Sequence, residues 1–334
     1  MGTRQDGREP RFGGALRSFR PFGSAGWKFA RLGDPLFKLV TFLFAALIAA
    51  IVIFMMIEMV LNSKMPFQKF GLGFLWKTTW DPVFEQFGAL PFIYGTVVSS
   101  VIALVLAVPV SIGIAIFLVE QAPRNLAQPI SFLVQLLAAI PSVVYGVWGI
   151  FVLAPTLRIH VYPRLQSTLG FLPLFKGNQN GLGLLTAGII LAVMILPIIT
   201  AVAADVLRAV PGTQREAALA LGSTKWEATR VVLQNSWPGI VGAIILGLGR
   251  AFGETMAVTM VIGNRPEISA SLLSPSFTIA SAIANEFTEA TSDIYLQSLI
   301  ELGLILFIIT FVINALARLL VWRITKRQGG VANA

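Results

Sequence analysis

PGTQREAALALGSTKWEATRVVLQNSWP, residues Pro211–Pro238, is a polar and helix-prone stretch that lies between two long apolar segments. Two Thr-x-x-Glu patterns in it, Thr213–Glu216 and Thr224–Glu227, have the spacing of a capping box, which marks a helix start. Gly222 lies between them, and glycine commonly follows the last turn of a helix. The stretch predicts two short helices joined at Gly222 and closed by Pro238. Helices this short are marginal alone in water, which favours packing against a partner protein.

The apolar segments around this stretch are typical of a membrane protein. Of the 334 residues, 56% are hydrophobic and only 12% are charged, whereas an average soluble domain is about 25% charged. A membrane span needs about 20 apolar residues. Six segments fit: Leu39–Met59, Leu90–Val119, Ala127–Leu153, Leu182–Val206, Ile240–Ile262 and Tyr295–Trp322. We therefore expect an all-α polytopic membrane protein with about six transmembrane helices.

The basic residues predict the orientation. Six spans put both termini on one side, and that side, with the Pro211–Pro238 loop, carries most of the 25 Lys and Arg residues. The positive-inside rule places it in the cytoplasm. We expect residues 1–37 to be a disordered basic cytoplasmic tail, residues 38–325 the transmembrane domain with loop 211–238, and residues 326–334 a second cytoplasmic tail.

Composition excludes several kinds of site. The chain has no cysteine, so disulfides and cysteine-based metal sites are excluded, and the single histidine, His160, argues against a histidine metal cluster or histidine-centred catalysis. We expect no metal site and no catalytic residue. The net charge of +9 is compatible with nucleic acid binding. The basic residues cluster beside the spans, however, so we expect contact with membrane lipid and no nucleic acid partner.

No G-x-x-x-x-G-K-[ST] phosphate loop occurs in the sequence. We expect a transport subunit without its own ATPase site and with no cofactor in this chain. If transport is driven by ATP, then ATP and Mg must bind a partner subunit.

Arg250 and Glu254 lie inside the fifth apolar segment. Their i, i+4 spacing puts both on one helix face. An ionisable group inside a bilayer costs at least about 2.5–3.5 kcal/mol, so such groups are normally paired and turned toward a bundle interior or a water path. A guanidinium fork suits an oxyanion, so we expect a substrate pathway here, with Thr255 beside it. The alternative is a structural ion pair that fixes helix packing.

Ser142 and Tyr145 follow Pro141 in the third segment and form a second candidate cluster. A proline frees a backbone carbonyl, which is tolerated in a membrane only where another group or water satisfies it. We place Ser142 and Tyr145 among the expected pathway residues, although a plain kink also explains the proline.

The loop Lys64–Gly88 is rich in aromatic residues. Aromatic side chains at this position commonly form a belt at the membrane interface. The alternative is a docking surface for an extracytoplasmic binding protein. The aromatic residues are Phe67, Phe70, Phe74, Trp76 and Trp80.

The central stretch carries a family resemblance. Glu216, Ala217 and Ala218, followed after three intervening residues by Gly222, resemble the EAA loop of ABC importer permeases. The resemblance implies that this loop, Arg215 included, forms coupling helices that lie in a cleft of an ATP-binding subunit.

Three longer strings narrow the resemblance to the PstC family of phosphate ABC importer permeases, over nearly the whole chain after the N-terminal tail. They are LLAAIPSVVYGVWGIFVLAP (Leu136–Pro155), GLGRAFGETMAVTMVIGN (Gly247–Asn264) and SLLSPSFTIASAIANEF (Ser271–Phe287). The long basic N-terminus departs from the family. The resemblance implies a type I ABC importer permease fold in the bacterial plasma (inner) membrane, with the family's membrane Arg and Glu at Arg250 and Glu254.

The resemblance also implies partners and a mechanism. The partners would be a sister permease subunit (PstA-like), an ATP-binding subunit dimer (PstB-like) and an extracytoplasmic phosphate-binding protein (PstS-like). The chain would move inorganic phosphate into the cytoplasm by alternating access. An oxyanion such as sulfate or molybdate, a proton-coupled anion transporter with Glu254 as proton carrier, and a non-transporting membrane scaffold or sensor remain alternatives.

Overall fold

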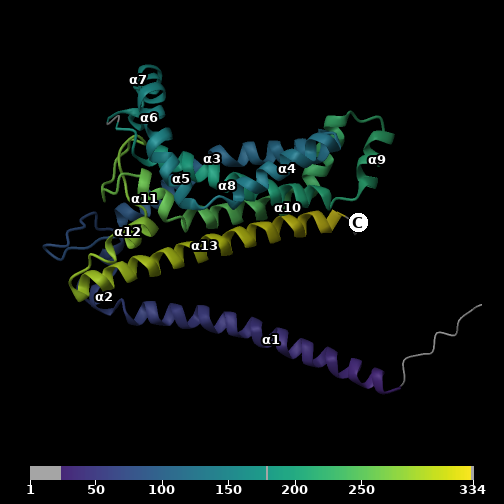
Figure 1. The fold of residues 1–334 in the computed structure, drawn as a ribbon, viewed down its shortest axis with the longest axis horizontal. Helices are drawn as coiled ribbons and strands as arrows, with labels where there is room; N and C mark the ends of the chain where they lie inside the picture. The colour runs from purple at the N-terminus through teal and green to yellow at the C-terminus, as the bar shows by residue number, and fades with distance from the viewer. Residues whose placement is uncertain (1–23, 178–179, 332–334) are drawn as a thin grey trace, which may run out of the picture. The chain divides into compact units, whose positions relative to one another are not determined.

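The computed structural model describes residues 24–177 and 180–331, and all regular structure in these two ranges is helical (Figure 1). The chain divides into two compact units, residues 1–56 and residues 57–334. The helices of the second unit carry the residues that the sequence singles out.

Residues 24–56 of helix α1 (Ser24–Leu61) are the described part of the first unit, and the helix contains the expected first span. The helix begins earlier than the sequence predicts, because residues 24–37, expected in a disordered tail, are helical. A helix that is already nucleated gains one hydrogen bond for each residue added, which favours extension beyond the apolar segment. Residues 1–23, the rest of the expected tail, lie outside the described residues.

Four long helices form the second unit: α3 (Leu90–Ile116), α8 (Leu184–Arg208), α10 (Lys225–Phe252) and α13 (Asp293–Val331). Helix α8 packs against both α3 and α10, and α13 packs against α10 (Figure 1). Small residues allow this close approach. A Cβ atom on Gly188 of α8, for example, would overlap the side chain of Ile102 on α3. Helix α13 also extends into the expected C-terminal tail, of which residues 332–334 lie outside the described residues.

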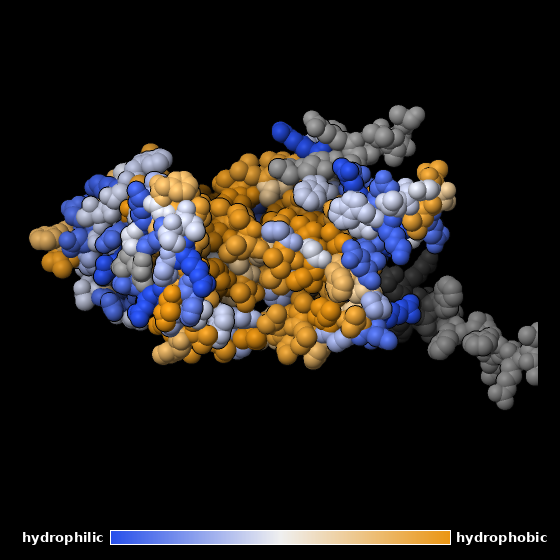
Figure 2. All heavy atoms as spheres, turned by 90° about the horizontal axis from the view of Figure 1, so that it is seen from above, coloured by the Kyte–Doolittle hydropathy of each residue, from blue (hydrophilic) through white to orange (hydrophobic). Residues whose placement is uncertain are grey.

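Six helical runs in the described residues are long and apolar enough to cross a membrane, as the sequence predicts. They are Pro35–Leu61, Leu90–Gln121, Ser142–Leu169, Leu184–Arg208, Lys225–Phe252 and Asp293–Arg323. On the face drawn in Figure 2, hydrophobic residues gather in the middle and hydrophilic residues lie toward both ends. This distribution is what a membrane protein requires.

The third apolar segment differs from its prediction as one span over Ala127–Leu153. Helix α4 (Arg124–Ala139) ends before Pro141, and α5 (Ser142–Trp148) begins after it. The Leu137 carbonyl, four residues before the proline, accepts a hydrogen bond from the Tyr145 hydroxyl at 2.7 Å. The break is therefore satisfied by a side chain, because proline offers no N–H for that carbonyl.

The membrane-length run that begins at α5 continues through short helical elements to Leu169. These are η3 (Gly149–Leu153), α6 (Ala154–Thr156), η4 (Leu157–Val161) and α7 (Tyr162–Leu169). Three other short elements also lie outside this run: η2 (Phe117–Gln121), η5 (Pro173–Phe175) and α11 (Met256–Val261).

The connection between α8 and α10 contains one short helix, α9 (Gly212–Ala220), and not the two expected. The predicted start at Thr213 is wrong, because Pro211, with φ −56° and extended ψ, is the N-cap. The capping box of Thr224 and Glu227 is confirmed, but the helix it starts is α10 itself, which continues through Pro238. Gly222 has φ +85°, as expected of the residue that ends α9.

The loop after α1 is part of the second unit. It contains α2 (Lys64–Phe70) and η1 (Gly71–Leu75), and it is hydrogen-bonded to α12 (Ile279–Glu286). The Trp80 indole N–H (2.6 Å) and the Tyr295 hydroxyl (2.9 Å) both donate to one carboxylate oxygen of Glu286. Burial raises the pKa of the Glu286 carboxyl, and these two donors oppose the shift.

The aromatic residues of this loop divide between two environments. Phe74 is fully buried, and the Trp80 ring packs edge-on against Phe87 and Phe92 at centroid distances of 4.8 and 4.7 Å. Phe67 and Trp76 are exposed. A belt or a docking surface is therefore available from only part of the aromatic set.

Gly95 of α3 provides a test of this packing. A Cβ atom there would overlap the backbone carbonyl oxygen of Phe277, which cannot move as a flexible side chain can. We expect Gly95→Ala to destabilise the protein by about 1–3 kcal/mol, the usual cost of overpacking, as measured by the fraction that stays monodisperse after heating in detergent. Gly113→Ala on the same helix is the control, since nothing lies within 4 Å of that position. Equal stability of the two variants would contradict the packing described.

Candidate functional site

The fifth apolar segment is broken where its charged residues lie. The sequence predicts one span over Ile240–Ile262, but α10 ends at Phe252 and α11 begins at Met256. The Glu254 carboxylate accepts a hydrogen bond from the Ala257 backbone N–H at 3.3 Å. The Glu254 side chain thus satisfies one of the N–H groups that a helix start leaves without a partner.

Arg250 and Glu254 form an ion pair across this break. The distance from Arg250 Nη2 to Glu254 Oε2 is 3.1 Å, and the exposed side-chain fractions are 46% for Arg250 and 2% for Glu254. Arg250 lies in the last turn of α10, where the helix dipole favours a cation. The pair therefore neutralises a buried carboxylate and leaves nearly half of the Arg250 side chain exposed at the surface of the chain.

The surface beside Arg250 is a continuous face of α10 and α11. Leu246, Gly253 and Met256 are exposed there, at spacings that put them on the same side as Arg250. A half-exposed guanidinium inside a membrane segment requires a polar path or a protein partner, because lipid offers it neither. The arrangement can hold an anion at Arg250 while Glu254 fixes the orientation of the guanidinium.

The helix that carries the second predicted cluster packs against the helix that follows the first. Helix α5, which carries Ser142 and Tyr145, packs on α11, and a Cβ atom on Gly146 would collide with Met260 Sδ. The Tyr145 hydroxyl donates its hydrogen bond to the Leu137 carbonyl, as described above. Ser142 is half-buried at the start of α5. Thr255 is half-buried in the break itself, and its hydroxyl donates to the Gly253 carbonyl at 3.3 Å.

Asn264, which follows the C-terminal end of α11, was not among the residues singled out from the sequence. Its backbone adopts φ +49°, its side-chain N–H₂ donates to the Thr259 carbonyl at 2.9 Å, and among the described residues its buried Oδ1 has no hydrogen-bond partner. A Gly-Asn pair is a known signal for left-handed backbone. That signal is present at Gly263–Asn264 and could have marked this turn.

The predicted coupling residues lie on α9 and just after it. Glu216 and Ala217 are exposed, Ala218 is buried against the bundle, and Arg215 is partly buried in an ion pair with Glu120. Beyond α9, Leu221 is 88% exposed and Trp226 is also exposed. Large apolar side chains at such exposure, next to a short helix, are typical of an interaction surface.

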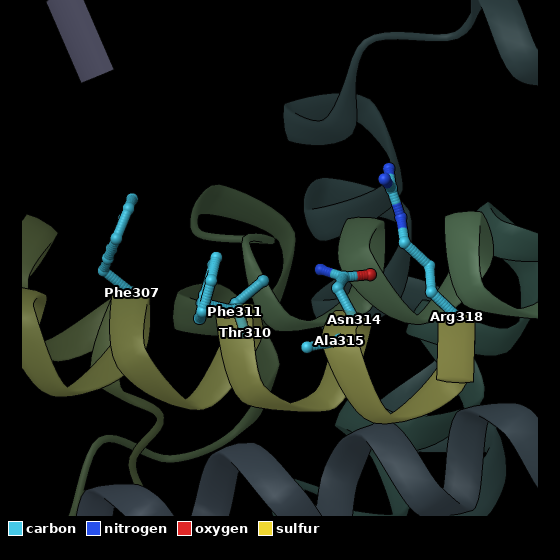
Figure 3. A pocket seen from close by; sticks show the side chains of 6 residues that line it. All are labelled: Phe307, Thr310, Phe311, Asn314, Ala315 and Arg318. Atoms are coloured by element: carbon cyan, nitrogen blue, oxygen red, sulfur yellow. The ribbon is translucent and has the colours of Figure 1, made fainter. Parts of the chain in front are cut away.

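A groove of about 610 Å³ lies elsewhere, along one side of α13 (Figure 3). It contains none of the residues that the sequence predicts for a site. Its lining residues are Phe307, Thr310, Phe311, Asn314, Ala315 and Arg318. Because all six come from one helix, the groove is an open helix face and not an enclosed ligand site. Within the described residues, no group of three or more His, Asp or Glu side chains is arranged to hold a metal ion.

Comparisons with known proteins identify the family of the chain. The family model described as "Binding-protein-dependent transport system inner membrane component" matches residues 107–326. The chain is 48% identical to the phosphate transport system permease protein PstC of Mesorhizobium japonicum, over 94% of this chain and 98% of that protein. It is 49% identical to the PstC of Pasteurella multocida (88% and 93%) and 42% identical to PstC 2 of Mycobacterium tuberculosis (86% and 92%).

A solved structure shows a similar fold at low sequence identity. An inward-facing MetNI methionine ABC transporter chain aligns with a TM-score of 0.54 and 16% identity, over 74% of this chain and 99% of that chain. At this identity the likeness concerns the fold alone. It shows that the helical arrangement is that of an ABC importer permease.

The ion pair makes a prediction about stability. Arg250→Gln would leave Glu254 almost fully buried with no countercharge, so we expect a loss of about 1–3 kcal/mol, below the range for fully buried pairs because Arg250 is half exposed. The double variant Arg250→Gln/Glu254→Gln should recover much of that loss, because no buried charge remains. Thermal unfolding followed by tryptophan fluorescence measures both. Arg164→Gln, at an exposed arginine of α7, is the control; a double variant as unstable as Arg250→Gln would contradict the pairing.

Proposed function

Since the chain belongs to the family of binding-protein-dependent transport system inner membrane components, we propose that it is the permease subunit of an ATP-driven importer that moves inorganic phosphate into the cytoplasm. The observation that carries the proposal is the Arg250–Glu254 pair at the break in the fifth span. It presents a forked cationic donor inside a membrane segment, and a guanidinium fork matches the geometry of phosphate oxygens.

The relatives supply the choice of anion. A guanidinium suits sulfate and molybdate as well as phosphate, so the charge alone does not select one of them. The relatives that match nearly end to end are named as phosphate transport permeases, which supports phosphate. Thr255, Ser142 and Tyr145 belong to the proposed pathway through their place on α5 and at the break before α11.

Energy for transport comes, in this proposal, from a partner. The sequence has no phosphate loop, so ATP and Mg are bound by a dimer of ATP-binding subunits. The segment Arg215–Gly222 docks on that dimer. The exposure of Glu216, Ala217 and Leu221 supports this role, because α9 presents these residues away from the bundle.

Two further partners complete the proposed importer. A sister permease subunit covers membrane surfaces such as the α13 groove, where Thr310, Asn314 and Arg318 would be costly against lipid. An extracytoplasmic phosphate-binding protein delivers the anion on the opposite side. We place both termini in the cytoplasm of a bacterial cell, because the positive-inside rule puts the α8–α10 connection and the basic tails there.

The proposed mechanism is alternating access. Closure of the ATPase dimer moves α9, and the spans open outward to receive phosphate beside Arg250. Hydrolysis then returns the chain to an inward-facing state. A proton-coupled carrier would need Glu254 free to exchange protons, whereas its carboxylate is paired with Arg250 and accepts a hydrogen bond from the Ala257 N–H.

Uptake in vesicles tests the substrate and the energy source. With the partner subunits present, we expect uptake of labelled phosphate that requires ATP and is competed weakly by sulfate and molybdate. Arg250→Gln should reduce it about tenfold to hundredfold, the equivalent of a charged hydrogen bond worth about 1.5–3 kcal/mol, while Arg164→Gln should not. Uptake driven by a pH gradient without ATP, or preference for another oxyanion, would overturn the corresponding part of the proposal.

Gly222 tests the docking role of α9. Its φ of +85° is strained for any residue with a side chain, although nothing lies within 4 Å of the position. We expect Gly222→Val to lower phosphate uptake while the ATPase remains active, and Gly222→Asn to be tolerated better, because asparagine adopts left-handed backbone more readily. Unchanged uptake by Gly222→Val in the assembled complex would contradict the role assigned to this turn.

A further inference from the structure

An ion pair joins the short helix α9 to the end of α3. The Arg215 Nε atom lies 2.9 Å from both carboxylate oxygens of Glu120, and Nη2 makes a further hydrogen bond to the same carboxylate. The two residues are 95 positions apart in the sequence. Only 8% of the Glu120 side chain and 28% of the Arg215 side chain are exposed. Forked pairs of this kind are geometrically specific as well as strong.

Glu120 reaches this position because α3 changes its winding at its end. Residues Phe117–Gln121 form the π-helical turn η2, in which the Ala122 N–H donates to the Phe117 carbonyl at 2.8 Å. The wider turn rotates the residues after it relative to a regular α-helix, and π-turns are frequent at functional sites. Pro123 then ends the segment. The Glu120 carboxylate is thereby directed at α9 from the end of a membrane span.

Other contacts fix α9 to two more spans. Arg215 Nη2 lies 3.5 Å from the Leu207 carbonyl in the last turn of α8. The neighbouring Gln214 accepts a hydrogen bond from the Asn235 side chain on α10 at 2.6 Å. Helix α9 is therefore attached to α3, α8 and α10, while Glu216, Ala217 and Leu219 are exposed.

We propose that Glu120 is a positioning residue for coupling, which transmits movement of α9 to α3 through Arg215. The inference rests on the proposed function and adds to it a residue outside the Arg215–Gly222 segment. A short helix held only by covalent connections could rotate against the bundle when a partner pulls on it. With the forked pair in place, α9 and the end of α3 move as one body.

A nearby ion pair provides a matched control. Asp205 and Arg208 also form a pair, at 3.0 Å, but both belong to the last turn of α8 and both side chains are well exposed. A pair within one helix cannot transmit movement between elements, and exposed pairs contribute little to stability. Arg208→Gln should therefore leave coupling unchanged.

The first measurement is the phosphate transported per ATP hydrolysed by the assembled importer in proteoliposomes. We expect Glu120→Gln and Arg215→Gln to lower this ratio at least about fivefold, the lower end of typical coupling effects, while ATP hydrolysis continues. The charge-swapped double variant Glu120→Arg/Arg215→Glu should restore part of the ratio, and Arg215→Lys should retain more of it than Arg215→Gln. A purely structural loss would lower uptake and ATP hydrolysis in parallel and would overturn the inference, as would an unchanged ratio in Glu120→Gln.

A second measurement does not depend on transport. Because the chain contains no cysteine, Ala220→Cys on α9 can carry a single nitroxide label on the full chain in detergent. We expect the label to become more mobile with Glu120→Gln and to regain order in the charge-swapped variant, with Arg208→Gln unchanged. If the wild-type complex shows no ATP-dependent phosphate uptake, the proposed function fails on its own. Unchanged label mobility in Glu120→Gln overturns the attachment of α9 by this pair, whatever the transported substrate.

Discussion

A polar group without a partner inside the hydrocarbon of a membrane is costly, and this constraint explains where the bundle is irregular. Two predicted spans are broken in the described structure, after Ala139 and after Phe252. In each case a side chain takes over a bond that the backbone cannot make. The Tyr145 hydroxyl donates to the Leu137 carbonyl at the first break, and the Glu254 carboxylate accepts from the Ala257 N–H at the second.

The helices that follow these two breaks pack against each other. Helices α5 and α11 begin at the breaks and meet at Gly146, where a larger residue would collide with Met260. Continuous helices would use their backbone groups in regular hydrogen bonds and would offer an ion only side chains. The breaks create helix ends inside predicted spans, and the Arg250–Glu254 pair lies at the second break. Broken helices of this kind form substrate and ion sites in many membrane transporters.

The sequence was informative where periodicity or composition decides the structure. Six apolar segments, the capping box at Thr224 and the left-handed Gly222 follow from local rules, and the structure has them. The predicted helix start at Thr213 was wrong because Pro211 provides the N-cap. Both Pro211 and the Thr213–Glu216 spacing signal a helix start, and the sequence alone leaves the choice between them ambiguous. The pair of Glu120 and Arg215 could not be predicted, because their proximity depends on how α3, α8 and α9 pack and on a π-turn without a sequence signature. The pair of Arg250 and Glu254 could be predicted because the two residues are only four positions apart on one helix face.

Helix α10 connects the turn at Gly222, in the proposed docking region, with Arg250 in the proposed substrate pathway. The sequence predicts that Pro238 closes a separate loop unit, but one helix runs from Lys225, next to the turn at Gly222, to Phe252, just beyond Arg250. At about 1.5 Å per residue, a helix of 28 residues is about 42 Å long. Its first turn is fixed by the capping box, and Asn235 ties it to α9. In the proposed mechanism, a displacement of α9 reaches Arg250 along this one helix, while the Arg215–Glu120 pair carries the same displacement into α3. The proposal therefore needs no separate relay between the docking surface and the charge inside the membrane.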